Sequence, residues 1–211
     1  GMMRFDLDKV GTAIAFKLLA ATVVPRPIAW VVTKDQQGQV NAAPYSFFNA
    51  MGSAPPTIAL GLLADPERGF KDTARNILDT GEFVINLVPE RLVAAMNLTA
   101  VDAPRGVDEL ALAGLETLPS THIAPPRIAE SPVAFECVSL SSVVTGPQQT
   151  VVIGRVLAVH IDDRFVKDAA RGHVLTDALD LVARSFGSDY IRTHDTFSLD
   201  RPTWAKLQAD T

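Results

Sequence analysis

The sequence predicts a mainly β fold with peripheral helices, and two observations carry that prediction. The first is a series of apolar runs of strand length bounded by turn residues, at 28–33, 40–44, 57–63, 82–88, 133–144 and 150–161. The second is that segments of helical pattern are few and interrupt or follow these runs, at 71–79, 89–97 and 177–186, with one more near 12–21. We therefore expect strands at the centre of the fold and helices around them.

The first two runs are predicted to form a β-hairpin. Residues 35–38 separate them, and Gly38 supplies the positive φ that such a turn favours. Pro25 and Pro27 impose an extended entry into the first strand. Pro44 has no N–H to donate to a ladder, so we expect the residues after it, through Asn49, to leave the sheet.

The later elements carry their own boundary signals. Gly81 follows the helix at 71–79 and suits its C-cap. The last two strands are long, and Thr145-Gly146-Pro147 forms the turn between them. Gly154 inside the final strand indicates a bend or the close approach of a neighbouring group. After about Val166 the strand pattern stops, and we expect a helical tail too short to form a domain.

The segment after Pro44 concentrates unusual chemistry. It carries a phenol, a hydroxyl, two phenyl rings and an amide, on Tyr45, Ser46, Phe47, Phe48 and Asn49. Aromatic rings beside unpaired backbone donors suit a planar heterocycle with polar edges. The alternative is a corner of the core in which the phenylalanine rings fill space.

A second candidate site lies at the entrance of the helix at 71–79. Lys71 and Thr73 stand beside free N–H groups and the positive end of the helix dipole, which predicts a phosphate site. Asp72 argues the other way, because an aspartate there naturally caps the helix and its charge opposes a phosphate. An ordinary helix start is therefore the alternative.

Several motifs occur in one order along the chain. They are the runs at 25–33, 41–49, 55–56, 71–77, 81–87, 130–133 and 152–160, which include Pro25-Arg26-Pro27, Pro44-Tyr45-Ser46-Phe47-Phe48-Asn49 and Lys71-Asp72-Thr73. In this order they resemble the flavin reductase-like FMN-binding proteins, over roughly residues 20–165. A continuous order of motifs is far more specific than any single motif.

The resemblance implies an FMN-binding split β-barrel that forms a homodimer, with FMN bound at the dimer interface. It also implies hydride transfer from NADH or NADPH to flavin, often in the reductase component of a two-component monooxygenase. FMN is therefore the expected cofactor, NADH or NADPH the co-substrate, and a monooxygenase the partner that would receive reduced flavin.

The same resemblance directs attention to candidate cofactor-binding residues, but it assigns no catalytic one, because a flavin reductase mainly positions two rings. Backbone N–H groups from Ser46 to Asn49 suit the carbonyl edge of the flavin. Arg26 suits phosphate or ribityl oxygens, and its alternative is an ordinary surface arginine. Arg184 suits the nicotinamide dinucleotide, and its alternative is a place on a helix that packs against the barrel. The candidates are Arg26, Thr33, Tyr45, Ser46, Phe47, Phe48, Asn49, Lys71, Asp72, Thr73 and Arg184.

Composition agrees with a soluble enzyme, and the single cysteine fits the expected cytoplasmic location. At 211 residues, a single domain over 1–211 is expected, with the barrel at about 25–165. A net charge of −5 argues against nucleic-acid binding, and no apolar stretch is long enough to span a membrane. The single Cys137 excludes an intrachain disulfide and is expected to be a buried strand thiol. The four histidines lack metal-binding spacing, and His160 is expected to have a structural role.

Other classes of protein stay open on sequence grounds. The chain has no G-x-G-x-x-G, Walker A or Gly-x-Ser-x-Gly motif, which argues against the Rossmann, P-loop and common hydrolase sites. A non-reductase FMN-binding module and a pyridoxamine-phosphate-oxidase-like flavoprotein use a similar barrel. A non-catalytic dimeric interaction protein is the remaining alternative.

Overall fold

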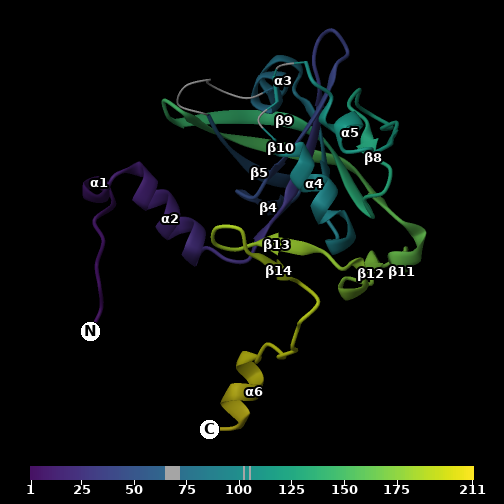
Figure 1. Cartoon of the computed structure of the whole chain (residues 1–211). Helices are drawn as coiled ribbons and strands as arrows, with labels where there is room; N and C mark the ends of the chain where they lie inside the picture. The colour runs from purple at the N-terminus through teal and green to yellow at the C-terminus, as the bar shows by residue number, and fades with distance from the viewer. Residues whose placement is uncertain (65–71, 102, 105) are drawn as a thin grey trace.

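The computed structural model describes residues 1–64, 72–101, 103–104 and 106–211, and Figure 1 shows its elements. The longer strands are β2 (Ala29–Lys34), β3 (Val40–Tyr45), β4 (Phe48–Ser53), β5 (Pro56–Leu63), β6 (Glu82–Asn86), β9 (Val133–Gly146) and β10 (Gln149–Ile161). The short strands are β1 (Arg26–Pro27), β7 (Thr117–Leu118), β8 (Arg127–Ile128), β11 (Val166–Asp168), β12 (His173–Val174), β13 (Val182–Arg184) and β14 (Tyr190–Arg192). The helices are α1 (Leu7–Val10), α2 (Thr12–Thr22), α3 (Asp72–Thr80), α4 (Val93–Thr99), α5 (Glu109–Leu112) and α6 (Trp204–Ala209), with 3-10 turns η1 (Glu90–Leu92), η2 (Asp163–Phe165) and η3 (Asp177–Leu179).

Seven strands form one sheet in the order β3-β2-β6-β9-β10-β5-β4, and all neighbours are antiparallel. The outermost strands β3 and β4 are consecutive in the chain, with only Ser46 and Phe47 between them. Three Cα steps span at most about 11 Å, so the two edges of the sheet must lie beside each other. The Gly61 N–H of β5 also donates to the Phe47 carbonyl at 2.7 Å. The sheet therefore curls into a barrel.

Strand β2 is buried on both of its faces, which explains its continuous apolar run. Ala29 and Val31 pack in one core cluster with β5, β6, β9, β10 and helix α3. Trp30 and Val32 pack in a second cluster on the opposite face of the sheet, with α4 and α5. The Trp30 indole N–H is satisfied there by the Thr99 hydroxyl at 3.0 Å. The barrel thus has a core inside and a second core beneath its helices.

Most elements predicted from the sequence are confirmed. All six apolar runs are strands, and their ends agree to within two residues. The helices near 12–21 and 89–97 are present as α2 and as η1 with α4, and α3 ends at Thr80 before Gly81, whose φ is 72°. Gly38 has a φ of 89° in the hairpin turn. Cys137 is completely buried on β9, and burial raises its pKa to about 12.

Two of the predictions were wrong. The chain does not leave the sheet for long after Pro44, because Phe48 and Asn49 already belong to β4, which pairs with β5. The helix expected at 177–186 is instead the turn η3 followed by strand β13. Asp180 has a left-handed φ of 52°, which ends the turn, and β13 then pairs with β1. Partner strands outside the local sequence decided both outcomes.

The tail is joined to the body by a small sheet in the order β1-β13-β14. On β14, Arg192 forms an ion pair with Glu90, with Nη2 2.7 Å from Oε1. The chain then leaves the body as a C-terminal arm, residues 193–211, which ends in α6; an N-terminal arm, residues 1–24, projects elsewhere as α1 and α2 (Figure 1). Within the described residues no helix has the length and apolarity to cross a membrane.

Any side chain at position 154 is expected to destabilise the fold. A Cβ there would lie 2.8 Å from Cζ of the buried Phe83 and 3.1 Å from Cδ1 of Ile58, at a register shift between β9 and β10. We expect Gly154→Ala to lower the free energy of unfolding by about 1–3 kcal/mol through overpacking. Gly52→Ala is the matched control, because its Cβ would meet only ordinary contacts at 3.9 Å. Urea denaturation of both variants tests this, and equal midpoints would contradict it.

Candidate functional site

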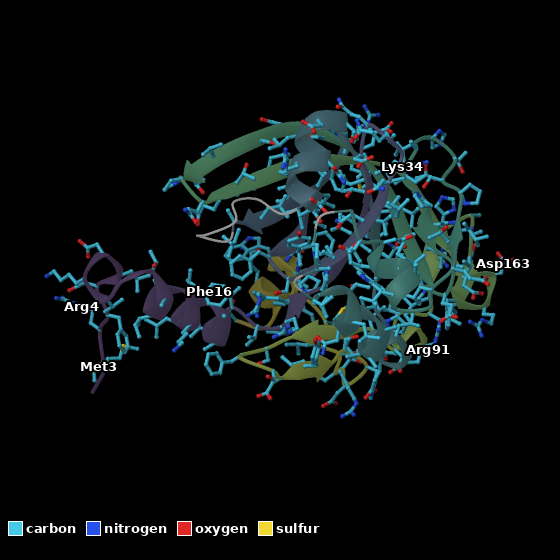
Figure 2. The ribbon with its side chains drawn as sticks, turned by 45° about the horizontal axis from the view of Figure 1, so that its top comes forward. Met3, Arg4, Phe16, Lys34, Arg91 and Asp163 are labelled. Carbon is cyan, nitrogen blue, oxygen red and sulfur yellow. The ribbon has the colours of Figure 1, made fainter. Side chains whose placement is uncertain are left out.

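The short connection between β3 and β4 is held tightly in place. A Cβ on Gly61 would lie 3.0 Å from the Cβ of Phe47, so a side chain at position 61 would push the connection away from β5. The Phe47 ring faces Phe16 of α2, with ring centroids 5.8 Å apart. Phe16 stands on the helix that projects from the body in Figure 2. The N-terminal arm therefore meets the body of the protein at the connection between β3 and β4.

Arg26 ties three segments together at this point. Its Nη1 donates to the carbonyl oxygens of Ala20 and Val23 at 2.6 and 3.0 Å, at the end of α2. Its Nη2 donates to the Ser185 carbonyl oxygen at 3.0 Å, and its Nε donates to the Ser46 hydroxyl at 3.3 Å. Burial, and then the nearby charge of Arg184, lower the pKa of Arg26. Arg26 is thus a buried anchor whose donors are used within the protein.

Arg184 lies on β13 directly opposite Arg26 on β1. Its guanidinium stacks on the Tyr190 ring, with Cζ 4.7 Å from the centroid, and Nη2 donates to the Gly187 carbonyl oxygen. Its Nε is buried and has no hydrogen-bond partner within the described part of the chain. Two like charges opposite each other across a strand pair are unfavourable. An anion beside Arg184 would offset this repulsion and accept from the unused donor.

A small cavity of about 70 Å³ opens beside Arg184. Tyr45 and Ser46 from the end of β3 line it, together with Asn97 of α4 and Tyr190 of β14. Aromatic, hydroxyl, amide and guanidinium groups therefore converge on one point from four segments that are distant in the sequence.

A buried polar network lies behind Tyr45. The side-chain amide of Asn41 lies between Thr73 and Glu109. Its oxygen accepts from the Thr73 hydroxyl at 2.9 Å, and its nitrogen donates to both carboxylate oxygens of Glu109, at 2.9 and 3.2 Å. Glu109 also accepts from the Ala42 N–H at 3.2 Å, and burial raises its pKa. Burial likewise raises the pKa of Tyr45 to about 12. Tyr45 therefore stays a neutral phenol at physiological pH.

Comparison with known proteins identifies the family. Residues 21–173 match the family described as flavin reductase like domain. The chain belongs to the flavin reductase-like family. Its relatives include an uncharacterized protein from Deinococcus radiodurans, 43% identical over 97% of this chain and 92% of its own length, and the uncharacterized protein YwrF from Bacillus subtilis, 36% identical over 96% and 100%.

Solved structures agree with this family. The nitrilotriacetate monooxygenase component B from Bacillus cereus has a TM-score of 0.89 at 30% identity, covering 94% of this chain and 99% of its own. The 2-nitrobenzoate 2-nitroreductase NbaA from Pseudomonas fluorescens has a TM-score of 0.86 at 32% identity, covering 96% and 98%. A split-barrel protein from Shewanella frigidimarina, with a TM-score of 0.79 at 21% identity, supports the fold alone. The predicted split barrel is confirmed.

The flavin reductase-like barrel brings some of the predicted site residues together. Arg26, Tyr45, Ser46, Phe47 and Arg184 surround the connection between β3 and β4. Phe48 and Asn49 follow on β4, where the Asn49 side-chain oxygen accepts from the Ala50 N–H at 2.7 Å. Sequence reasoning missed Asn97, because no motif in the helix at 89–97 marks it as a site residue.

Other predicted residues lie away from that cluster. Thr33 and Thr73 are completely buried, and Thr33 accepts from the Asn76 amide at 3.0 Å. Lys71 lies outside the described residues. Asp72 opens α3 and lines a separate cavity of about 160 Å³, to which Asp35 and Asp79 add carboxylates. The described walls of that cavity carry an excess of negative charge, which does not favour a phosphate.

Proposed function

We propose that this protein binds FMN, transfers a hydride from NADH or NADPH to the flavin, and supplies reduced flavin to a partner monooxygenase. Family membership supports flavin binding. Two structural neighbours are named for redox chemistry: a monooxygenase component at 30% identity and a nitroreductase at 32% identity. The observation that carries the proposal further is the buried Nε of Arg184, which lies beside Tyr45 and Ser46 and has no partner among the described residues.

The residues present fit a flavin or nicotinamide nucleotide. Arg184 offers a charged donor to an anionic oxygen and already rests on Tyr190, so little side-chain entropy is lost on binding. Ser46 and Asn97 add neutral polar groups to the same cavity. Arg26 contributes positive charge from behind, while its donors keep Ser46 and the end of β13 in position.

When bound, FMN supplies the redox chemistry by accepting a hydride at N5 of its ring. The protein is left to hold the nucleotide and to orient it. Arg184 anchors the anionic part of the nicotinamide dinucleotide, and the β3–β4 connection presents Tyr45, Ser46 and Phe47 to the ring system. Since Gly61 and Arg26 fix that connection, its groups are preorganised for a planar ligand.

Anaerobic titration of the FMN-loaded protein tests this function. Addition of NADH or NADPH should bleach the flavin absorbance at a rate well above that of free FMN. Binding of FMN without bleaching by either nucleotide would favour a non-reductase FMN-binding module. Absence of any flavin binding would leave the alternative of an interaction protein.

A homodimer is part of the same proposal, because one chain leaves apolar surface uncovered. On the β9–β10 hairpin, Val144 is 73% exposed and Leu140 and Val159 are about half exposed. Phe197 and Trp204 on the C-terminal arm are 92% and 73% exposed. Surface of this kind marks an interface, and a second copy offers the same surface in return.

Light scattering should therefore report about twice the mass of one chain at micromolar concentration. We expect Val144→Lys to weaken the dimer, since it places a charge in the apolar interface, whereas Lys34→Glu on the β2–β3 hairpin should leave it unchanged. A monomer across the micromolar range with flavin bound would contradict a shared interface.

A further inference from the structure

A second polar groove lies on the barrel, separate from the site described above. Its volume is about 480 Å³, and it is lined mainly by polar atoms where β8 begins, β9 begins and β10 ends. It shares no lining residue with the cavity beside Arg184. Two side chains in the groove, His160 and Arg127, have nitrogen atoms without a hydrogen-bond partner among the described residues.

His160 is held from behind by a buried carboxylate. Glu136 is completely buried and lies diagonally across β9 and β10 from His160, with Oε2 2.5 Å from the His160 Nε2. Glu136 also accepts from the backbone N–H groups of Thr121 and His122, at 2.9 and 2.7 Å. His160 and these two N–H groups lower the Glu136 pKa to about 2 despite burial, so it is ionised at neutral pH.

The ionised carboxylate determines which ring nitrogen carries the proton. Because Glu136 only accepts, the Nε2 that faces it carries hydrogen. The other nitrogen, Nδ1, has no partner among the described residues, and His160 is 26% exposed to the groove. When His160 carries hydrogen on both ring nitrogens, Nδ1 is a second, charged donor that points away from Glu136.

Arg127 faces the same groove from β8. Its Nε is buried without a hydrogen-bond partner, and its guanidinium forms no ion pair within the part of the chain that the structure describes. A buried donor left without an acceptor costs about 1–3 kcal/mol. An arginine in this state is suited to a carboxylate, which accepts from Nε and Nη in parallel.

The acidic residues at the rim do not satisfy these two groups. Asp162 is engaged by Arg164, whose Nη2 lies 2.9 Å from Oδ2. Asp163 also lines the groove, but it is exposed and lies at the edge of the molecule (Figure 2). Among the described residues of the groove, Arg127 offers a cationic group without an ion-pair partner and His160 a ring nitrogen without a partner, while the Asp163 carboxylate stands at the exposed rim.

We infer that this groove is a second binding site, for a small hydrophilic organic carboxylate. Arg127 binds the carboxylate side-on, and His160, oriented by Glu136, donates to it from Nδ1. Lactate is a suitable probe, and lactamide is its neutral counterpart of nearly the same shape. The site does not depend on flavin binding, so its failure and the failure of the proposed function are separate results.

Nuclear magnetic resonance of the ¹⁵N-labelled histidine rings measures this binding directly. We expect lactate to shift the His160 ring signals saturably, with lactamide giving no shift. Arg127→Gln should weaken lactate binding at least about ten- to a hundredfold, because it removes the side-on pair of charged hydrogen bonds and one such bond already accounts for that factor. His160→Gln should weaken it by a smaller factor, and Arg201→Gln, on the exposed C-terminal arm, should have no effect.

Three results with lactate, lactamide and the variants would overturn the inference. They are equal affinity of the Arg127→Gln variant, equal binding of lactamide, and shifts at His160 that do not saturate. Tighter binding of inorganic phosphate than of lactate would also reject a carboxylate site. The circular dichroism spectrum of each variant should match that of the unmodified protein, which shows that the barrel is intact whether or not the protein binds flavin.

Discussion

Arg26→Ala should lower the free energy of unfolding by about 3 kcal/mol or more. Arg26 is 7% exposed. Its guanidinium donates to three backbone carbonyls and one hydroxyl, which belong to the end of α2, the β3–β4 connection and the end of β13. Hydrogen bonds to charged groups contribute about 1.5–3 kcal/mol each, and the loss is reduced because exposed carbonyls regain water. Urea denaturation followed by circular dichroism measures the difference.

Arg4→Ala is the matched control, because Arg4 is exposed and only pairs with Asp6 at 3.4 Å. It should change the free energy of unfolding by less than about 0.5 kcal/mol. Limited proteolysis adds a local measurement: loss of Arg26 should expose the chain between α2 and β1 to cleavage. Unchanged stability together with unchanged proteolysis would show that the four hydrogen bonds do not anchor the N-terminal arm.

Arg184→Ala should raise the apparent KM for NADH or NADPH about ten- to a hundredfold while FMN affinity stays nearly constant. This corresponds to the loss of one charged hydrogen bond, about 1.5–3 kcal/mol, to an anionic oxygen of the nucleotide. The prediction rests on the buried, unused Nε of Arg184 and on the facing charge of Arg26. Arg184→Lys should restore part of the affinity, because it keeps the charge but not the planar fork.

Arg192→Ala controls for the charge of the hairpin. Arg192 lies on the neighbouring strand β14, but its guanidinium is engaged by Glu90 and exposed. Its removal should leave both KM and FMN affinity unchanged. Weakened FMN binding with an unaltered KM in Arg184→Ala would place this arginine at the flavin. If neither the KM nor the FMN affinity changed, Arg184 would have only a packing role against Tyr190.

The strands were predictable because their signals are local. Apolar runs, turn glycines and prolines mark six of the seven strands of the main sheet and the helix α3, and each signal lies within a few residues of the element that it marks. The order of motifs also sufficed to recognise the family. The segment 177–186 failed for the opposite reason: β13 exists because β1 pairs with it, and its own three residues carry no strand signal.

The candidate site divides in the same way. Tyr45, Ser46 and Phe47 were predicted from one contiguous segment. The closure of the barrel decided the rest of the site. It places Arg184 opposite Arg26, brings Asn97 into the same cavity, and buries Thr33 and Thr73. Arg26 and Ser185 are 159 residues apart in the chain yet share a hydrogen bond. No local pattern encodes such a contact, since it depends on the register of strands that meet only when the whole sheet has closed.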